Sequence, residues 1–365
     1  MTHIAIIGSG IIGAAIAYEL SLIKGLKITL IEEQKVAALG STGSALGILM
    51  GIVSQKTKGR GWKLRQSSLQ RYETLIPELE KLTGQIIPFN RQGILKLRFA
   101  EDELERWEKL AKIRYNQGYQ LDILDRQQLS KKFPQIKNNK IIGAIYSPQD
   151  RQINPKVLTQ ALVTGASING VNCKFGVKVQ NLISTNLDGS NTRHCYQIKT
   201  TDGNLEIDWL VIAAGLGSTP LTESVNQKLD LRPVLGQALQ LKLPQNLGNA
   251  AFQPVINGED INIVPLGNGE YWIGATVEFP NTKGEIINQP ELLEKLRQQA
   301  ISFCPDLKKA EIIKTWSGKR PRPEGEPAPI IRKLPNYNNV ILATGHYRNG
   351  VLLAPATALA VREQL

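Results

Sequence analysis

Cysteine, histidine and methionine are all scarce in this chain of 365 residues, which contains 3 cysteines, 3 histidines and 2 methionines. Cys173, Cys195 and Cys304 form no Cys-x-x-Cys pair, so we expect neither a disulfide framework nor a zinc site, and no other metal site is indicated. So few thiols are typical of a protein from a reducing compartment, and we predict a cytoplasmic location.

Long hydrophobic runs are also lacking. The most apolar stretch, from Ile4 to Ile23, contains three glycines and Glu19, and no basic region precedes it. A buried parallel strand and its helix explain this stretch better than a signal peptide does. No other run approaches the roughly 18 apolar residues that a membrane span needs, so we predict no transmembrane segment.

Acidic residues are fewer than basic ones: 44 Lys and Arg against 32 Asp and Glu give a net charge of +12. Part of the excess surrounds Trp62, at Lys56, Lys58, Arg60, Lys63 and Arg65. Contact with a polyanion or a membrane is one interpretation; a solvated basic face, or one biased toward an anionic cofactor and anionic substrates, is the favoured one. Because no recognisable nucleic-acid module accompanies these residues, we predict no nucleic-acid partner. The sequence leaves a homo-oligomer open.

What the chain does have is a glycine pattern at its start. An apolar strand runs into Gly8-x-Gly10-x-x-Gly13, an alanine-rich helix follows, and a second strand ends in Glu32. The glycines permit a sharp turn, a close approach to a pyrophosphate and tight packing of helix on sheet. Glu32 lies 32 − 8 = 24 residues after Gly8, close to the spacing of about 20 for a carboxylate that binds ribose hydroxyls. The pattern predicts a dinucleotide site and leaves FAD and NAD open.

Three later segments return to the same sheet. The small-residue loop 40–47 follows the ribose-binding strand, where its hydroxyls and amides can approach a cofactor. Residues 208–218 read as a buried strand that ends in a turn at Gly215, and residues 339–345 as another, followed by a polar turn and a C-terminal helix from Val351 to Leu365. The cofactor domain is therefore predicted to be discontinuous.

Between these segments the pattern is mixed. We expect helices over 62–82 (interrupted at Pro77), from 101, from 125, over 154–170 and over 290–304. We expect strands over 85–99, 174–181 and 196–200, and short strands over 232–277, with turns at 90–93, 188–189, 202–203, 257–258 and 267–269. The predicted fold combines α/β and α+β: a discontinuous Rossmann-type dinucleotide-binding domain (1–83, 148–222, 316–365), assigned to FAD by the resemblance described next, and a mixed, antiparallel-sheet substrate domain (84–147, 223–315).

Over nearly its whole length the chain resembles the FAD-dependent D-amino-acid oxidase superfamily, and most of all its glycine oxidase branch. The resemblance rests on Gly8-x-Gly10-x-x-Gly13, Glu32, Arg232-Pro-Val-x-Gly236, Gly274-Ala-Thr276, Arg320-Pro321 and, most specifically, the run from Ala343 to Thr357. In such proteins the last turn lies at the pyrimidine end of the flavin ring, where the dipole of the following helix stabilises negative charge.

The resemblance and the motifs together imply a set of cofactor contacts, all of them non-covalent because no cysteine lies in the motifs that face the ring. The predicted FAD-binding residues are Gly8, Gly10, Ile11, Ile12, Gly13, Glu32, Glu33, Ser41, Thr42, Leu46, Gly47, Ile48, Val177, Gly215, Gly345, His346, Tyr347, Arg348, Asn349, Gly350, Val351 and Leu352.

For the substrate, the resemblance implies contacts at Arg320 and Arg348. A guanidinium offers a planar fork for a carboxylate, so Arg320 is the predicted anchor; a structural salt bridge is the alternative. At a third substrate position glycine oxidases have a tyrosine, and this chain has Asn262. That departure puts glycine in doubt as the substrate.

The implied reaction is FAD-dependent oxidation of a small amino acid (glycine, an N-substituted glycine or a D-amino acid) to an imine. Hydrolysis of the imine gives an oxo acid and ammonia or an amine, and O2 reoxidises the flavin to give H2O2. The resemblance implies no catalytic protein base, so His346 is expected to position backbone, while His3 and His194 look structural. The alternatives are an amino-acid dehydrogenase that uses a quinone or another acceptor, an NAD(P)-linked dehydrogenase, and a non-catalytic flavoprotein subunit.

Overall fold

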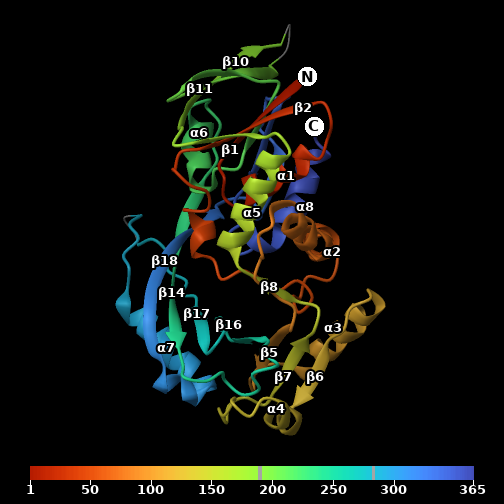
Figure 1. The fold of residues 1–365 in the computed structure, drawn as a ribbon, viewed down its shortest axis with the longest axis vertical. Helices are drawn as coiled ribbons and strands as arrows, with labels where there is room; N and C mark the ends of the chain where they lie inside the picture. Colours follow the sequence, from red (N-terminus) through yellow and green to blue (C-terminus); the bar gives the residue numbers. More distant parts are fainter. Residues whose placement is uncertain (188–190, 282–283) are drawn as a thin grey trace.

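The computed structural model describes residues 1–187, 191–281 and 284–365. The chain forms two large sheets, and Figure 1 shows them at opposite ends of an elongated molecule, with both termini at the end that holds the first sheet. The turn expected at 188–189 lies outside the described residues.

The first sheet has six strands and is parallel except at one edge. In spatial order they are β19 (Ile330–Lys333), β20 (Val340–Thr344), β13 (Trp209–Ile212), β1 (Thr2–Ile7), β2 (Leu26–Glu32) and β9 (Asn172–Phe175). The central strands are almost completely buried, as expected for a parallel sheet that is covered on both faces. Strands from the beginning, middle and end of the chain thus meet in one sheet.

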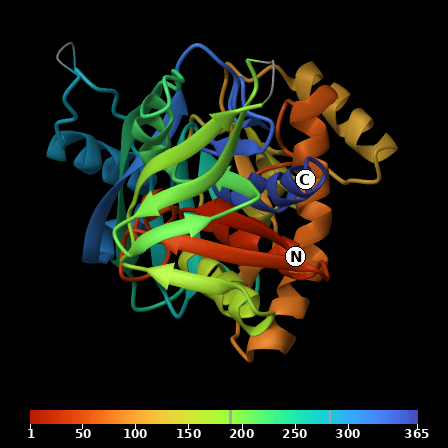
Figure 2. The same ribbon diagram turned by 90° about the horizontal axis from the view of Figure 1, so that it is seen from above.

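Helices cover one face of this sheet and a second sheet covers the other. The helices are α1 (Ile11–Ser21), α2 (Gly59–Thr83), α5 (Pro155–Ile168) and α8 (Gly350–Arg362), whose apolar sides share one core with the sheet. The opposite face packs against β10 (Val179–Asn186), β11 (Arg193–Thr200), β12 (Gly203–Glu206) and α6 (Ser218–Glu223). Figure 2 looks down on these green strands where they cross the red N-terminal strands.

The second large sheet has eight strands, mostly antiparallel. Their order is β18 (Glu311–Pro323), β14 (Leu231–Lys242), β17 (Glu270–Gly274), β16 (Ile261–Gly267), β15 (Val255–Gly258), β5 (Ile94–Arg98), β7 (Gly143–Ser147) and β6 (Asp122–Asp125). One face packs against α4 (Arg126–Lys132) and α7 (Pro290–Phe303). The other face carries a small apolar cluster that includes Leu46, from the loop after β2.

Smaller elements join the two sheets. A three-stranded sheet combines β3 (Ile48–Leu49), β8 (Arg151–Ile153) and β4 (Phe89–Asn90), while α3 (Leu104–Asn116) contacts β6 and, through Arg114, the carbonyl of Ile52. Short 3-10 turns occur at η1 (Ser41–Ser44), η2 (Gly215–Gly217) and η3 (Pro305–Lys309). The predicted combination of α/β and α+β architecture is confirmed.

One predicted turn is wrong, and the difference matters for the site. Asn257 and Gly258 belong to β15, and the hairpin turns instead at Glu259, whose φ is +51°, and Asp260. Gly258 is required for packing: a Cβ there would approach the ring of Phe303 in α7 to 2.7 Å. Asn257 is therefore paired with Asn262 across the hairpin.

Other differences concern boundaries. Pro77 does not interrupt α2, which begins at Gly59, runs on to Thr83 and is capped by Gly84. The acidic residues at 101–103 precede α3 and do not form its first turn. The strand expected over 174–181 is two strands in two different sheets, separated at Gly176, whose φ is +73°. Gly176 can leave the strand direction there because it has no side chain.

Candidate functional site

The glycine motif forms a tight junction between β1 and α1. A Cβ at Gly13 would lie 1.8 Å from the carbonyl oxygen of Gly8, so only glycine lets the helix lie this close to the strand. Gly10 precedes the first helical residue, and Ile11 N–H donates to Thr42 Oγ1 at 3.0 Å. The amino end of α1 therefore meets the carboxyl edge of the sheet, where main-chain amides and the helix dipole favour a phosphate. These residues fit the pyrophosphate of a dinucleotide.

Glu32 lies at the end of β2 beside this junction. One carboxylate oxygen accepts hydrogen bonds from Ser9 N–H (2.7 Å) and Ser9 Oγ (2.9 Å), and the other from Gln34 N–H (3.0 Å). Each carboxylate oxygen can accept more than one hydrogen bond, so capacity for a ribose hydroxyl remains. Val177, another predicted FAD contact, donates its N–H to the Glu32 carbonyl at 2.9 Å.

We expect Glu32→Ala to weaken FAD binding by about 1–3 kcal/mol, because charge-assisted hydrogen bonds to the ribose and to Ser9 are lost. Fluorescence titration of the apoprotein with FAD measures the change. Glu32→Gln and Glu33→Ala are the matched variants: the first keeps the shape without the charge, and the second removes the neighbouring carboxylate. Weakening by Glu33→Ala alone would place the ribose on Glu33.

The loop after β2 connects the cofactor cradle to the eight-stranded sheet. While Thr42 contacts the start of α1, Ser41 Oγ donates to the Lys319 carbonyl at 2.6 Å and Ser44 Oγ to the Ser317 carbonyl at 2.9 Å. In return Trp316 Nε1 donates to the Ser44 carbonyl at 3.1 Å. The serines of this loop thus fix β18, the strand that carries Arg320, against the cofactor end of the molecule.

Arg320 lies in β18 opposite Val234 of β14. Its guanidinium occupies the space above Gly236, where a Cβ would come within 2.2 Å of Nη2. Nη1 donates to the Leu235 carbonyl at 3.0 Å and Nη2 to the Thr276 carbonyl at 3.1 Å. None of the ion pairs found among the described residues involves Arg320. Three of its five N–H groups therefore remain for a ligand.

Burial and the nearby Arg348 lower the pKa of Arg320 from its ordinary value, while Tyr347, Glu278 and Asp260 partly oppose that effect. An arginine stays charged in proteins. A half-buried cation that forms no ion pair is stabilised further when an anion binds to it. This arrangement suits a carboxylate.

The C-terminal turn lies next to Arg320. Tyr347, whose φ is +52°, donates its N–H to the Pro321 carbonyl at 3.1 Å. His346 is buried, and its Nε2 is 2.8 Å from Thr357 Oγ1 in α8; burial, with a smaller effect of Arg60, lowers its pKa to about 3. The imidazole is therefore neutral at ordinary pH, which suits the predicted positioning role.

Arg348 has a different environment from Arg320. It forms an ion pair with Asp260 at 3.0 Å, and both side chains are largely exposed, at 42% and 75%. Asp260 lies in the turn of the β15–β16 hairpin, so this pair links the C-terminal turn to the strand that carries Asn262. An exposed ion pair of this kind is weak, and a substrate anion can compete for it.

Asn262 belongs to a row of side chains that crosses the sheet. The residues opposite one another on successive strands are Lys96, Asn257, Asn262, Gly274, Ala238 and Trp316. Directly paired residues point to the same face of a sheet. Leu46 marks that face, because it packs where a Cβ of Gly274 would be, at 2.8 Å. Sequence reasoning missed Lys96, Asn257 and Asp260 as members of the site, since the misplaced turn hid the hairpin pairing.

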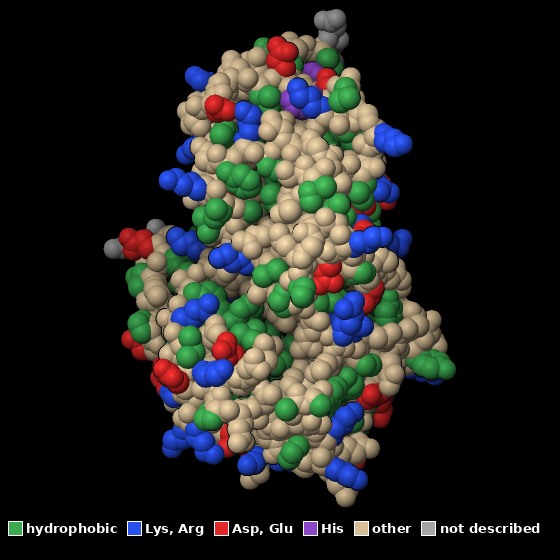
Figure 3. Space-filling model, viewed as in Figure 1, with side chains coloured by type: hydrophobic (Ala, Val, Ile, Leu, Met, Phe, Trp, Pro, Cys, Tyr) green, Lys and Arg blue, Asp and Glu red, His purple; other side chains and the backbone are tan. Residues whose placement is uncertain are grey.

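The basic segment around Trp62 lies at the start of α2. Arg114 is fully buried, lies 3.7 Å from the centre of the Trp62 ring and donates to the carbonyls of Ile52, Ser54 and Lys56. Trp62 is thus a packing residue for this segment. On the face shown in Figure 3, Lys and Arg side chains are scattered among acidic ones and do not gather in a single patch.

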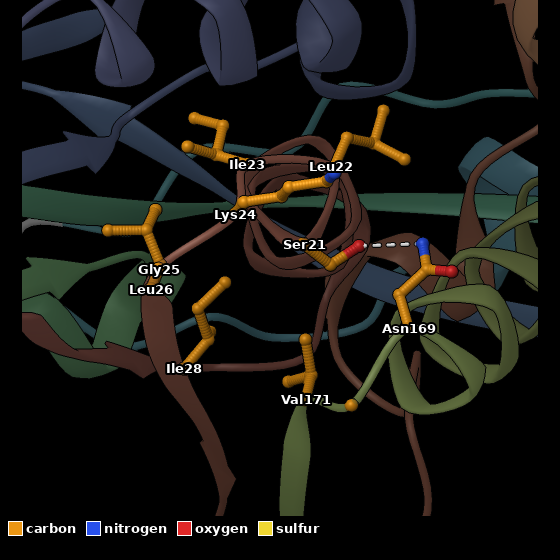
Figure 4. A pocket seen from close by; sticks show the side chains of 10 residues that line it. Ser21, Leu22, Ile23, Lys24, Gly25, Leu26, Ile28, Asn169 and Val171 are labelled. Carbon is orange, nitrogen blue, oxygen red and sulfur yellow. Dashed lines mark hydrogen bonds between the residues drawn. The ribbon is translucent and has the colours of Figure 1, made fainter. Parts of the chain in front are cut away.

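A pocket elsewhere is not part of this site. It lies between the carboxyl end of α1 and the α5–β9 loop, where Ser21 Oγ accepts a hydrogen bond from Asn169 Nδ2 at 2.9 Å (Figure 4). Leu22, Ile23 and Val171 line it. Since the glycine cradle is at the other end of α1, this pocket does not contact the predicted cofactor residues.

Comparison with known proteins identifies the family of this chain. A family model described as FAD dependent oxidoreductase (DAO) matches residues 3–364. The chain belongs to that family. The predictions of an FAD cofactor and of a flavoenzyme of the amino-acid oxidase type are confirmed, and the NAD(P)-linked alternative is dropped.

Individual relatives agree with this assignment. The chain is similar to the glycine oxidase of Geobacillus kaustophilus, with 28% identity over 366 residues that cover 100% of this chain and 93% of the relative. The crystal structure of that enzyme superposes with a TM-score of 0.86 at 26% identity, covering 100% and 94% of the two chains. A protein named "Bifunctional protein ThiO/ThiG" from Synechocystis is 31% identical over 364 residues, which are 99% of this chain and 51% of that one.

The structure thus brings most predicted site residues to one region: the glycines, Glu32, loop 41–48 and the turn 345–352 at the carboxyl edge of the first sheet, and Arg320 with Asn262 on one face of the second. Their individual roles stay predictions. Within the described part of the chain, no group of three or more His, Cys, Asp or Glu residues could hold a metal ion. No helix there is long and apolar enough to cross a membrane.

Proposed function

We propose that the protein oxidises a small amino acid, either glycine, an N-substituted glycine or a D-amino acid, with O2 as the final electron acceptor. The observation that carries this proposal is Arg320, a charged guanidinium with three unused N–H groups and no carboxylate partner among the described residues. Its neighbours are the C-terminal turn and the row of side chains that contains Asn262. The names of the glycine oxidase relatives support the same substrate class.

In this proposal the chain supplies position and electrostatics. Arg320 holds the substrate carboxylate in a planar fork, and this fixes Cα relative to the cofactor. When bound, FAD supplies the acceptor for the hydride that leaves Cα. The amine reacts in its neutral form, so it gives up its proton before this step, and the imine product hydrolyses in water to the oxo acid and ammonia or an amine. His346 is buried and neutral, and holds the backbone of the turn through Thr357.

The domain division and the environment are also proposals. We propose that residues 1–83, 148–222 and 316–365 bind FAD and that residues 84–147 and 223–315 bind substrate, although β18 pairs with β14 along its whole length. Arg320 therefore lies in the substrate sheet while the loop at 41–44 holds it to the cofactor end. We further propose that the protein works in the cytoplasm.

The proposal is tested by mixing the purified, yellow holoprotein with candidate substrates without oxygen and recording flavin absorbance at 450 nm. We expect bleaching by one or more of glycine, sarcosine, proline-like imino acids and D-amino acids, and then H2O2 formation in air. Bleaching without reoxidation by O2 would indicate a dehydrogenase that uses a quinone or another acceptor. A flavin that no amine reduces would indicate a non-catalytic subunit, and a protein that takes up no FAD would overturn the whole interpretation.

Asn262 leads to a prediction about which of these candidate substrates the protein prefers. Its amide is shorter than the tyrosine implied for glycine oxidases, which leaves volume and a different donor at the substrate position. We expect kcat/KM to be higher for substrates bulkier than glycine, and Asn262→Tyr to shift the preference back toward glycine. Steady-state kinetics with glycine, sarcosine and D-alanine measures the shift. Equal or better efficiency of the unmodified protein with glycine would contradict this expectation.

A further inference from the structure

Three polar side chains on neighbouring strands form a continuous chain of hydrogen bonds beneath the candidate substrate site. Lys96 Nζ donates to Asn257 Oδ1 at 3.1 Å, Asn257 Nδ2 to Asn262 Oδ1 at 2.9 Å, and Asn262 Nδ2 to the Gly274 carbonyl at 3.1 Å. The three residues are paired across β5, β15 and β16, so the sheet register itself aligns them. Asn257 is almost fully buried, with 5% exposed, and Asn262 is half-buried.

The direction of every bond in this chain is determined by its two ends. A lysine ammonium has three donors and no acceptor, so the atom of Asn257 that faces it must be the oxygen. A carbonyl accepts only, so the atom of Asn262 that faces Gly274 must be the nitrogen. Asn257 Nδ2 also donates to the Ile261 carbonyl at 3.3 Å, which agrees with the same orientation. One polarity satisfies all of these groups, and a flipped amide would place two acceptors or two donors together.

Lys96 is held in an unfavourable position for a charge. Burial lowers the pKa of its ammonium from the ordinary value, while Asp102 and Asp260 oppose that effect from a distance. The Asn257 oxygen is its hydrogen-bond partner in the sheet. Lys96 is half-buried, so its ammonium loses part of its solvation and the acceptor beside it is favourable. The hydrogen bond to Asn257 fixes the end of the Lys96 side chain in the row.

The fixed orientation of the Asn262 amide determines which of its groups faces the half-exposed side. Its oxygen is engaged by Asn257, and one N–H is engaged by Gly274, so the second N–H is what this residue offers to the half-exposed side. Gly274 lies directly under Leu46 of the cofactor loop, which places this half-exposed side beside the candidate site. A substrate acceptor, such as a carboxylate oxygen, can therefore bind this second N–H.

We propose that Lys96, acting through Asn257, is a positioning residue that orients the Asn262 amide so that it donates a hydrogen bond to the substrate carboxylate. This inference rests on the proposed function only in naming Asn262 as a substrate contact. Neither Lys96 nor Asn257 touches the substrate. Their role is to hold the Asn262 oxygen away from an anion that it would repel.

The test is Asn257→Asp, an isosteric change that keeps the acceptor for Lys96 and replaces the donor to Asn262 by an oxygen. The Asn262 oxygen then faces a carboxylate, and the amide loses its single favoured orientation. We measure the dissociation constant of acetate, as the simplest carboxylate, from the change in flavin absorbance of the oxidised holoprotein. We expect acetate to bind about tenfold more weakly to Asn257→Asp, with FAD content and Tm close to those of the unmodified protein.

Two further variants complete the design. Lys96→Met keeps the length of the stem but removes the donor, and should weaken acetate binding in the same direction. Asn246→Asp is the matched control: the same chemical change in the same part of the fold, at an amide whose oxygen accepts from Gly269 N–H at 2.7 Å, a role that a carboxylate fulfils equally well. It should leave acetate binding unchanged.

The acetate measurement does not depend on turnover, so it separates this inference from the proposed function. Failure of every amine to reduce the flavin would end the proposed function and leave the acetate result standing. Unchanged acetate binding in both Asn257→Asp and Lys96→Met would overturn the positioning role, as would the absence of any acetate binding by the unmodified protein. If either variant fails to retain FAD, the other still decides the matter, and loss of FAD by both would show that the chain of amides is purely structural.

Discussion

Replacing Arg320 by alanine or lysine is expected to lower kcat/KM roughly 30- to 1000-fold, while FAD remains bound. This loss corresponds to about 2–4 kcal/mol of transition-state stabilisation. In the proposed function the guanidinium supplies two parallel hydrogen bonds and a charge to the substrate carboxylate, and it forms no ion pair with a carboxylate among the described residues. A lysine cannot reproduce this planar fork and would leave the Leu235 and Thr276 carbonyls without their donors. Both the apparent KM and the rate of anaerobic flavin reduction should therefore worsen.

Arg322→Lys is the matched control for this prediction. Arg322 lies two residues further along β18, and unlike Arg320 it already has a carboxylate partner, the partly exposed Glu324 at 3.4 Å. It should change kcat/KM little. Normal reduction kinetics of both Arg320 variants on every active substrate would show that Arg320 is not the anchor, and Arg348 or Lys319 would have to be tested next.

The cofactor half of the molecule could be predicted from the sequence because its signals are local. A strand, a glycine turn and a helix within thirty residues predict the cradle and a dinucleotide as its ligand, and the structure shows Gly13 in the tight contact that the motif demands. The same reasoning located the strand and turn at the C-terminal end. Local sequence suffices here because consecutive elements of such a unit pack against each other.

The substrate half could be predicted only in outline. Its strands come from distant segments, and their order and register depend on packing that no local pattern reveals. A glycine after an asparagine favours a turn, yet at Gly258 the absence of a side chain serves the contact with Phe303. Because that turn was misplaced by two residues, the pairing of Asn257 with Asn262, and through it the involvement of Lys96, could not be inferred.

Strand β18 is the element that unites the two halves. Its backbone accepts the hydroxyls of the loop at 41–44, its Pro321 carbonyl accepts the N–H of Tyr347, and between these contacts it presents Arg320. Both segments that hold it are predicted to bind FAD. A substrate anchor fixed in this way keeps its position relative to the cofactor, as oriented hydride transfer requires.

His346 leads to the second large effect, which concerns stability at low pH. Burial lowers the pKa of its imidazole to about 3, whereas the same group in the unfolded chain has the ordinary value of 6.5. The unfolded state therefore binds a proton as pH falls below 6.5 and the folded state does not, so this contribution to stability is complete above pH 6.5 and is lost progressively toward pH 3. The difference between these two pKa values lowers the free energy of unfolding by about 4 kcal/mol between pH 6.5 and pH 3, of which about 2–3 kcal/mol is lost by pH 4.5.

The measurement is the free energy of unfolding in urea between pH 7 and 4.5, with FAD in saturating excess, for the unmodified protein and for His346→Gln. Glutamine can still reach the Thr357 hydroxyl that His346 Nε2 contacts at 2.8 Å, but it does not titrate. Because His3, whose pKa burial also lowers, is present in both proteins, the difference between the two curves isolates His346. We expect the variant to be less sensitive to acid even if it is less stable at pH 7. Parallel curves would mean that solvent reaches the imidazole and protonates it in the folded protein. The C-terminal turn would then be packed less tightly against α8 than the buried His346–Thr357 pair requires.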